Sequence, residues 1–216
     1  MGKLQSLATH NIVLKTYLEI VRSSGPKIYP GSPIITLEML RPHDRLVAIE
    51  KHPEEFAALA AALNPDARAR AIEADGYQRL PALLPPPERR GLILLDPPYE
   101  SADEFERLAD AFARAYRRSA TGIYILWFPL KVQPKIEALA GELRGAGAAK
   151  LLLLTIDIGA SASSDAQGRL TASGLLVANP PYGFDLEMRE AVSEILPLLR
   201  RGKSAESCVE WLIAGR

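Results

Sequence analysis

The stretch that most constrains this chain is residues 91–100, with the sequence GLILLDPPYE. Residues 91–95 form an uninterrupted apolar run, which is typical of a strand buried on both faces of a parallel sheet. The strand must end abruptly, because the two prolines after Asp96 cannot donate backbone hydrogen bonds to a continuing strand or helix. The sequence therefore predicts a stiff loop at the carboxyl end of a strand, carrying Asp96 and Tyr99. In open α/β sheets this is the edge where ligands bind.

The functional groups of this loop suit the methylation of an exocyclic amine on a planar base. The Asp96 carboxylate and the Pro97 carbonyl oxygen can accept both N–H bonds of the amine, while the Tyr99 ring can stack on the base. Most of the rate would then come from alignment with a methyl donor. The pattern Asp/Asn-Pro-Pro-Tyr/Phe is the signature of amino methyltransferases that use S-adenosylmethionine. The alternative is an ordinary proline-rich turn, and the preceding apolar strand favours the catalytic interpretation.

Two further predicted strands are also followed by acids. Residues 45–50 end in Glu50, which suits the ribose hydroxyls of a nucleoside cofactor. Asp75 follows the short strand 70–73, and with Gly76 allowing close approach it suits an adenine amino group. The alternatives are a solvated glutamate and an aspartate that caps the next helix. Because an acid follows each of three successive strands, the βαβ order predicts that all three lie on one edge of one sheet.

Other candidate groups lie near a helix start and on a charged helix. Pro33 is predicted as the first residue of a helix, with Ser32 as its N-cap, and this helix start either only caps or faces a ligand. The helix predicted over 102–118 carries a basic cluster that can meet phosphates, although solvated helix faces carry such charges routinely. The cluster consists of Arg107, Arg114, Arg117 and Arg118.

Composition limits the class of protein. The 216 residues are 48% hydrophobic, enough for one sizeable core. Lys plus Arg equals Asp plus Glu at 26 each, so a nucleic-acid substrate would need a local basic patch. Cys208 is the single cysteine, which excludes a disulfide framework and a cysteine metal cluster. With no signal peptide, membrane-length apolar segment or metal-ligand spacing, we expect a cytoplasmic protein without a metal. We also expect a monomer.

The remaining pattern completes an α/β fold. Further helices are predicted in 4–22 and over 53–63, 133–146 and 185–199, and further strands over 122–128, 150–158, 172–178 and 207–213. The strands 150–158 and 172–178, joined by a loop at 159–168, form a predicted antiparallel hairpin. A mostly parallel sheet with a hairpin at its C-terminal end indicates the Rossmann-like fold of class I S-adenosylmethionine-dependent methyltransferases.

A second Asn-Pro-Pro-Tyr sequence occurs at 179–182. It follows the strand 172–178, so it is expected at the opposite end of the sheet from Glu50 and Asp75. We therefore interpret it as a strand terminator rather than as the catalytic loop.

From about residue 17 to the C-terminus, the sequence resembles the bacterial ribosomal RNA large subunit methyltransferase J family. The segments that carry the resemblance are YPGSP at 29–33, ADGY at 74–77, RRGLILLDPPYE at 89–100, ATGIY at 120–124 and TASG at 171–174. The resemblance implies N6 methylation of one adenine in 23S rRNA, with S-adenosylmethionine as the methyl donor. It makes Asp96 the catalytic acceptor, and it places Ser32, Glu50, Asp75 and Gly76, with Asp96, at the cofactor.

The sequence departs from this family at its N-terminal part. The family has a central strand leading into a Gly-rich loop for the methionine half of the cofactor, and no Gly-x-Gly element follows a strand before residue 45. Residues 1–33 are interpreted as the remnant of an inserted helical segment and turn, and 34–216 as the methyltransferase domain. We expect unpaired internal sheet edges and poor cofactor binding. A DNA adenine-N6 methyltransferase and a non-catalytic nucleic-acid-binding remnant are the alternatives.

Overall fold

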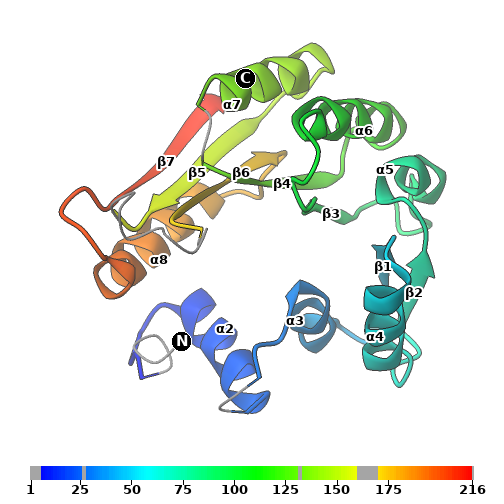
Figure 1. Cartoon of the computed structure of the whole chain (residues 1–216), viewed down its shortest axis with the longest axis horizontal. Helices are drawn as coiled ribbons and strands as arrows, with labels where there is room; N and C mark the ends of the chain where they lie inside the picture. The colour runs from blue at the N-terminus through cyan, green and yellow to red at the C-terminus, as the bar shows by residue number, and fades with distance from the viewer. Residues whose placement is uncertain (1–5, 26–27, 131–132, 160–169, 216) are drawn as a thin grey trace. The chain divides into compact units, whose positions relative to one another are not determined.

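The computed structural model describes residues 6–25, 28–130, 133–159 and 170–215 (Figure 1). By its internal contacts the chain divides into two compact units, Met1–Arg79 and Leu80–Arg216.

The first unit is built around a pair of short parallel strands. Its elements are α2 (Ile12–Ser23), α3 (Ser32–Met39), β1 (Leu46–Glu50), α4 (Pro53–Leu63), β2 (Ala69–Glu73) and α5 (Gly76–Arg79). Leu46 lies opposite Ala69 and Glu50 opposite Glu73. The strands run in the same direction, so the chain leaves β1 and β2 at the same end of this two-stranded sheet.

The two N-terminal helices begin at different residues from those predicted. A helical pattern was predicted within 4–22, and the helix begins at Ile12. It begins there because the Asn11 side chain caps it, accepting hydrogen bonds from the backbone N–H groups of Val13 and Leu14 at 3.1 Å each. Ser32 was predicted as an N-cap, and this is wrong. Gly31 occupies the cap and Ser32 is already helical, with Pro33 next to it in the first turn.

The second unit is a five-stranded sheet with helices packed against it (Figure 1). Its strands are β3 (Leu92–Leu95), β4 (Ile123–Pro129), β5 (Leu151–Asp157), β6 (Ala172–Ala178) and β7 (Glu206–Ile213), in the order β3-β4-β6-β5-β7. Its helices are the 3₁₀ helix η1 (Leu80–Leu83), α6 (Glu104–Arg118), α7 (Gln133–Gly145) and α8 (Phe184–Leu199). Strands β3 and β4 are parallel, and the pairs β4–β6, β6–β5 and β5–β7 are antiparallel. The predicted hairpin is therefore β5–β6, and most of its loop lies outside the described residues.

Both faces of this sheet carry apolar side chains, since neighbouring residues of a strand point to opposite faces. One face includes Tyr124, whose ring meets the α6 side chain Phe112 at a centroid distance of 5.2 Å. The other includes Val177 and Val209, with Phe184 and Met188 of α8 packed against their cluster. Both clusters are buried, so this sheet and its helices form the main core of the second unit.

The strand before the Asp-Pro-Pro-Tyr loop is less buried than predicted. Leu92 and Leu94 are 62% and 42% exposed, whereas Leu95 is buried. β3 is an edge strand of its sheet, with β4 as its one hydrogen-bonded neighbour among the described strands. β1 likewise pairs with β2 alone among the strands described, and its Val47 is 40% exposed. The strands thus form two sheets rather than the single sheet predicted, because no described strand pairs with both β1 and β3. Unpaired sheet edges were expected from the sequence, and β1 and β3 each have one among the described strands.

Candidate functional site

The loop after β3 is held in place by Tyr99. Its hydroxyl donates a 2.6 Å hydrogen bond to the backbone carbonyl oxygen of Trp127 in β4. Its ring packs against Phe105 and Trp127, with centroid distances of 5.0 and 5.7 Å. The Tyr99 backbone has φ of 55°, in the left-handed region that bulky side chains rarely adopt. These contacts fix the loop against the end of β4.

Asp96 combines an exposed side chain with a raised pKa. Among the residues that the structure describes, none donates a hydrogen bond to its carboxylate, and the side chain is exposed. Partial desolvation nevertheless raises the pKa of Asp96 above its usual range. The pKa of Tyr99 is also raised, first by burial and then by the negative charges of Asp96 and Glu104. The Asp96 oxygens are therefore available to a ligand, beside an aromatic ring.

The Tyr99 hydroxyl is already engaged, so what this residue can offer a ligand is its ring. Pro97 is buried, in contrast to the exposed Asp96 and Pro98 on either side of it. The predicted roles of Asp96 and Pro97 as acceptors, and of Tyr99 as a stacking surface, stay predictions.

The start of α6 is also anchored. Lys135 donates a 2.8 Å hydrogen bond to the carbonyl oxygen of Ala102, and its ammonium lies 5.6 Å from the centroid of the Phe105 ring. Glu104 is buried and lies 3.7 Å from Arg107. The segment that follows Asp96 is thus tied to α7 as well as to β4.

The predicted basic cluster of α6 is largely engaged within the protein. Besides the contact of Arg107 with Glu104, Arg114 lies 3.0 Å from Asp110, and Arg118 donates a 2.8 Å hydrogen bond to the carbonyl oxygen of Leu84. These side chains stabilise α6 and its junction with the preceding loop. The cluster is therefore a weaker candidate for phosphate binding than its sequence suggested.

The two acids of the first unit cap backbone groups. Glu50 accepts from the backbone N–H groups of Lys51 and His52 at 2.6 and 2.8 Å. Asp75 accepts from those of Tyr77 and Gln78 at 2.9 and 3.3 Å. The capping alternative for Asp75 is thus present in the structure, and Glu50 has a structural role that the sequence did not indicate. Their predicted contacts with a cofactor stay predictions.

The predicted site residues fall on two sheets. Glu50, Asp75 and Gly76 follow the carboxyl ends of the neighbouring strands β1 and β2, and Ser32 is exposed at the start of α3. A side chain added at Gly76 would meet no atom within 4 Å, so open space adjoins this position. Asp96 belongs to the second unit with Pro97 and Tyr99.

The second Pro-Pro sequence lies at the other end of its sheet from Asp96. Ala178 pairs with Tyr124 near the start of β4, whereas Leu95 pairs with Leu126 farther along it. The Asn179 side chain donates 2.8 Å hydrogen bonds to the carbonyl oxygens of Ala120 and Gly122. Its predicted placement was opposite Glu50 and Asp75, which belong to the other unit, so that placement stays a prediction. Asn179 closes the turn before β4.

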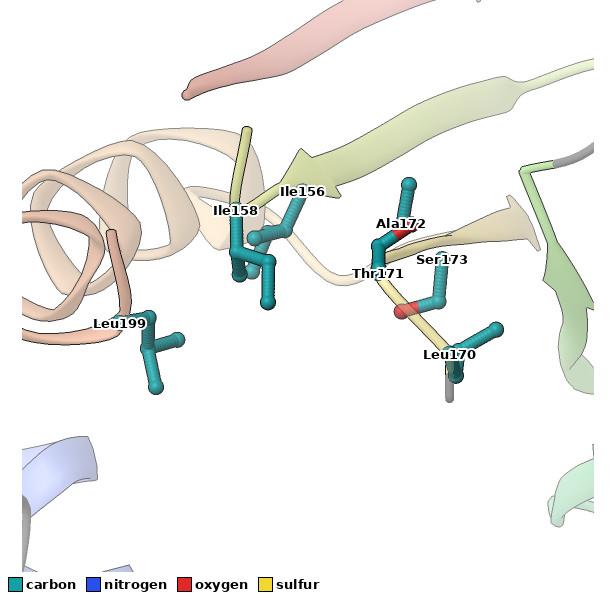
Figure 2. Close-up of a pocket in the computed structure, with 7 residues that line it drawn as sticks. All are labelled: Ile156, Ile158, Leu170, Thr171, Ala172, Ser173 and Leu199. Atoms are coloured by element: carbon teal, nitrogen blue, oxygen red, sulfur yellow. The ribbon is translucent and has the colours of Figure 1, made fainter. Parts of the chain in front are cut away.

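Two hollows are lined by described residues of the second unit. Figure 2 shows a hollow of about 170 Å³ at the ends of β5 and β6, lined by aliphatic side chains such as Ile156 and Leu199 and by the hydroxyl groups of Thr171 and Ser173. None of its described lining residues is ionisable, so these side chains offer no proton acceptor. The other has a volume of about 420 Å³ and is lined by Arg90, Lys150 and the residues from 179 to 182. No sequence pattern indicated a site at these two cations, which are separated by sixty positions in the chain but share one end of the sheet.

Within the described ranges, no group of three or more His, Cys, Asp or Glu side chains is arranged to hold a metal ion. No described helix is both long and apolar enough to cross a membrane.

The α/β fold, with an Asp-Pro-Pro-Tyr loop at the carboxyl end of a strand, defines the class of Rossmann-like methyltransferases. Within this class, the chain belongs to the family described as "Ribosomal RNA large subunit methyltransferase D, RlmJ", which it matches over residues 3–213.

Relatives of known name and structure agree with this family. The chain is 37% identical over 204 residues to Ribosomal RNA large subunit methyltransferase J of Escherichia coli K12, covering 93% of this chain and 72% of that protein. It is 35% identical over 187 residues to the protein of the same name from Haemophilus influenzae, covering 87% and 64%. A crystal structure of a Legionella pneumophila protein matches with a TM-score of 0.84 and 27% identity, covering 97% of this chain and 78% of that one. The chain thus spans between 64% and 72% of the two curated relatives.

Proposed function

We propose that this protein transfers a methyl group from S-adenosylmethionine to the N6 amine of an adenine in 23S rRNA. The observation that carries the proposal is the Asp96 carboxylate, which accepts no hydrogen bond from the described residues and stands in a loop fixed by the Tyr99–Trp127 contact. The similarity to two proteins named ribosomal RNA large subunit methyltransferase J supports the choice of substrate.

The chemistry requires little from the protein beyond alignment and hydrogen bonding. S-adenosylmethionine supplies a methyl group activated by a positively charged sulfur. The Asp96 carboxylate and the Pro97 carbonyl oxygen accept the two N–H bonds of the adenine amine, so that its lone pair is directed at the methyl carbon. Tyr99 holds the plane of the base. When bound, S-adenosylmethionine would supply the methyl carbon and its sulfur would keep the electron pair of the broken sulfur–carbon bond, while Asp96 would accept the proton that the amine loses as the nitrogen–carbon bond forms.

The residues proposed to hold the cofactor fit its nucleoside half. Ribose hydroxyls and an adenine amine are donors, and Glu50 and Asp75 offer carboxylate oxygens at one edge of the β1–β2 sheet. The open space beside Gly76 allows close approach. Ser32 and Asp96 complete the proposed set, and the sequence assigns no residue to the amino-acid half.

The test measures transfer of a radiolabelled methyl group to protein-free 23S rRNA, followed by digestion and identification of the modified nucleoside. N6-methyladenosine in the wild-type reaction, formed slowly because poor cofactor binding is expected, and absent with Asp96→Ala, is the expected result. Methylation of duplex DNA in place of rRNA would instead support a DNA adenine methyltransferase. If neither substrate is methylated and calorimetry detects no binding of S-adenosylmethionine, the enzyme proposal fails.

Localisation and oligomeric state are part of the same proposal. We expect a cytoplasmic monomer. Light scattering of the purified protein at several concentrations checks the second point, and a dimer mass would contradict it.

A further inference from the structure

The larger hollow gathers residues from four adjacent strand ends. Arg90 precedes β3, Thr121 precedes β4, Asn179 follows β6 and Lys150 precedes β5, and all line the same hollow of about 420 Å³. In the sheet order β3-β4-β6-β5 these strands are neighbours. β6 runs antiparallel to the others, so its carboxyl end meets their amino ends. The hollow is therefore one continuous feature at the end of the sheet opposite Asp96.

Its two cations stand on opposite sides. β3 and β5 are separated by three strand spacings, or about 14 Å between backbones. Arg90 and Lys150 are both exposed, and over the described part of the chain neither forms an ion pair with an acidic side chain. In a protein with as many acidic as basic residues, this is a local positive site. Two separated cations suit a chain of phosphates better than one small anion.

An exposed aromatic ring lies at the same hollow. Tyr182 lines it and is fully exposed, although an aromatic ring usually finds apolar cover. The loop that presents it is rigid: Pro180 is buried, and the Asn179 side chain holds the carbonyl oxygens of Ala120 and Gly122 at 2.8 Å each. A fixed, water-exposed ring beside cations is the arrangement with which proteins bind single-stranded nucleic acids.

We propose that this hollow is a second RNA-binding site, which contacts phosphates with Arg90 and Lys150 and stacks one unpaired base on Tyr182. The inference rests on the proposed function for its choice of RNA as the partner. It goes beyond that function because the hollow lies at the other end of the sheet from Asp96 and would hold a segment of RNA other than the target adenine. An acidic peptide would match the two cations but would have no planar group for the exposed ring.

The test measures the binding of a fluorescently labelled single-stranded RNA of twelve nucleotides to the full chain by anisotropy, at several salt concentrations. Loss of a stacked base in Tyr182→Ala should weaken binding about five- to a hundredfold. Removal of both cations in the double variant R90Q/K150Q should also make the slope of log affinity against log salt shallower by about 1.4. Arg189→Gln, which removes an exposed charge on α8, is the matched control and should change neither quantity.

Each outcome decides the proposal. Weaker binding in R90Q/K150Q with Tyr182→Ala unchanged would make the hollow a simple anion site and overturn the assignment to RNA. Unchanged binding in both, or equal binding of a labelled poly-glutamate peptide by the wild type, would overturn it as well. Asp96→Ala separates this proposal from the catalytic one: it should abolish methyl transfer but leave the effects of Tyr182→Ala and R90Q/K150Q on RNA affinity in place.

Discussion

The hydroxyl of Tyr99 donates a 2.6 Å hydrogen bond to the carbonyl oxygen of Trp127, which ties the loop after β3 to the neighbouring strand β4. The bond connects the two parallel strands of the second unit just where Asp96 is exposed. It also means that the hydroxyl and the ring of Tyr99 can be tested separately.

Tyr99→Phe should keep the ring and lose the hydrogen bond. Because the Trp127 carbonyl oxygen is left without this donor, we expect a loss of about 1 kcal/mol in the free energy of unfolding. Tyr99→Ala should lose more stability and also much of the methyl-transfer rate, since the ring against Phe105 is gone. Urea unfolding and initial rates check both variants. Equal rates in Tyr99→Ala and the wild type would contradict a role for the ring in holding the base.

Alanine substitution of the residue before the two prolines should have opposite effects in the two Pro-Pro loops, on activity at Asp96 and on stability at Asn179. Asp96→Ala should abolish methyl transfer with little loss of stability, because the carboxylate is exposed and contacts no donor among the described residues. Asn179→Ala should lower stability by about 1–3 kcal/mol, since it breaks two hydrogen bonds at a residue with φ of 55°. Its activity at a temperature where it is folded should stay within a few-fold of the wild type. Loss of activity in Asn179→Ala as deep as in Asp96→Ala would identify 179–182 as the catalytic loop.

Stability should depend on pH through Asp96. Its pKa is raised in the folded protein by desolvation, so the folded state holds this proton more tightly than the unfolded chain. The resulting stabilisation is fully present below the ordinary aspartate pKa, about 3.9, and is lost as pH rises through the higher folded value. Asp96→Asn does not titrate, so the wild type should lose stability relative to this variant over that interval. Urea unfolding of both proteins across the acidic range measures the difference, and a difference that grows in the opposite direction would show that the pKa is lowered instead.

Amide substitutions can separate capping from cofactor binding at Glu50 and Asp75. Glu50→Gln and Asp75→Asn keep a side-chain oxygen that can accept from the backbone N–H groups, so both variants should fold nearly as well as the wild type. Each loses a charge-assisted hydrogen bond worth about 1.5–3 kcal/mol, so affinity for S-adenosylmethionine should fall about ten- to a hundredfold. Calorimetry measures it. Unchanged affinity in both variants would leave these acids with their capping role alone.

Gly174 is expected to tolerate no side chain. An added Cβ would lie 2.5 Å from two ring atoms of Phe128 and 2.9 Å from the carbonyl oxygen of Leu154. Because Phe128 is fully buried and cannot swing away, Gly174→Ala should destabilise the protein by about 1–3 kcal/mol. Gly141→Ala, where the added Cβ meets no atom within 4 Å, is the control. Thermal melts measure the stability of both variants. Equal melting temperatures for Gly174→Ala and Gly141→Ala would contradict the packing of β4 against β6.

The sequence predicted the ranges of the helices and strands better than it predicted the burial of their side chains. The predicted helix 53–63 matches the bounds of α4, and its last residue, Leu63, is fully buried. The burial of 91–95 was overestimated, because an apolar run cannot show whether a second strand lies beside it. Leu92 and Leu94 are exposed for this reason.

The candidate site was predictable only where residues are close in the chain. Asp96 and Tyr99 lie in one short motif, so a sequence pattern could find them. The Tyr99–Trp127 bond spans 28 positions, and the hollow combines Arg90, Lys150 and Tyr182 through the strand order β3-β4-β6-β5. The antiparallel insertion of β6 between β4 and β5 brings these side chains together, and no local pattern shows which strands become neighbours.

That insertion also sets the order in which the second unit can be assembled during synthesis. β4 has its second neighbour only when β6 has left the ribosome, and β5, which is made between them, has both of its neighbours only after β7 (Figure 1). A chain stalled after β5 would therefore display the open backbone edges of two apolar strands, β4 and β5. Such edges are prone to pair with other chains, so the nascent chain is most vulnerable to misassembly while residues 158–213 are being translated.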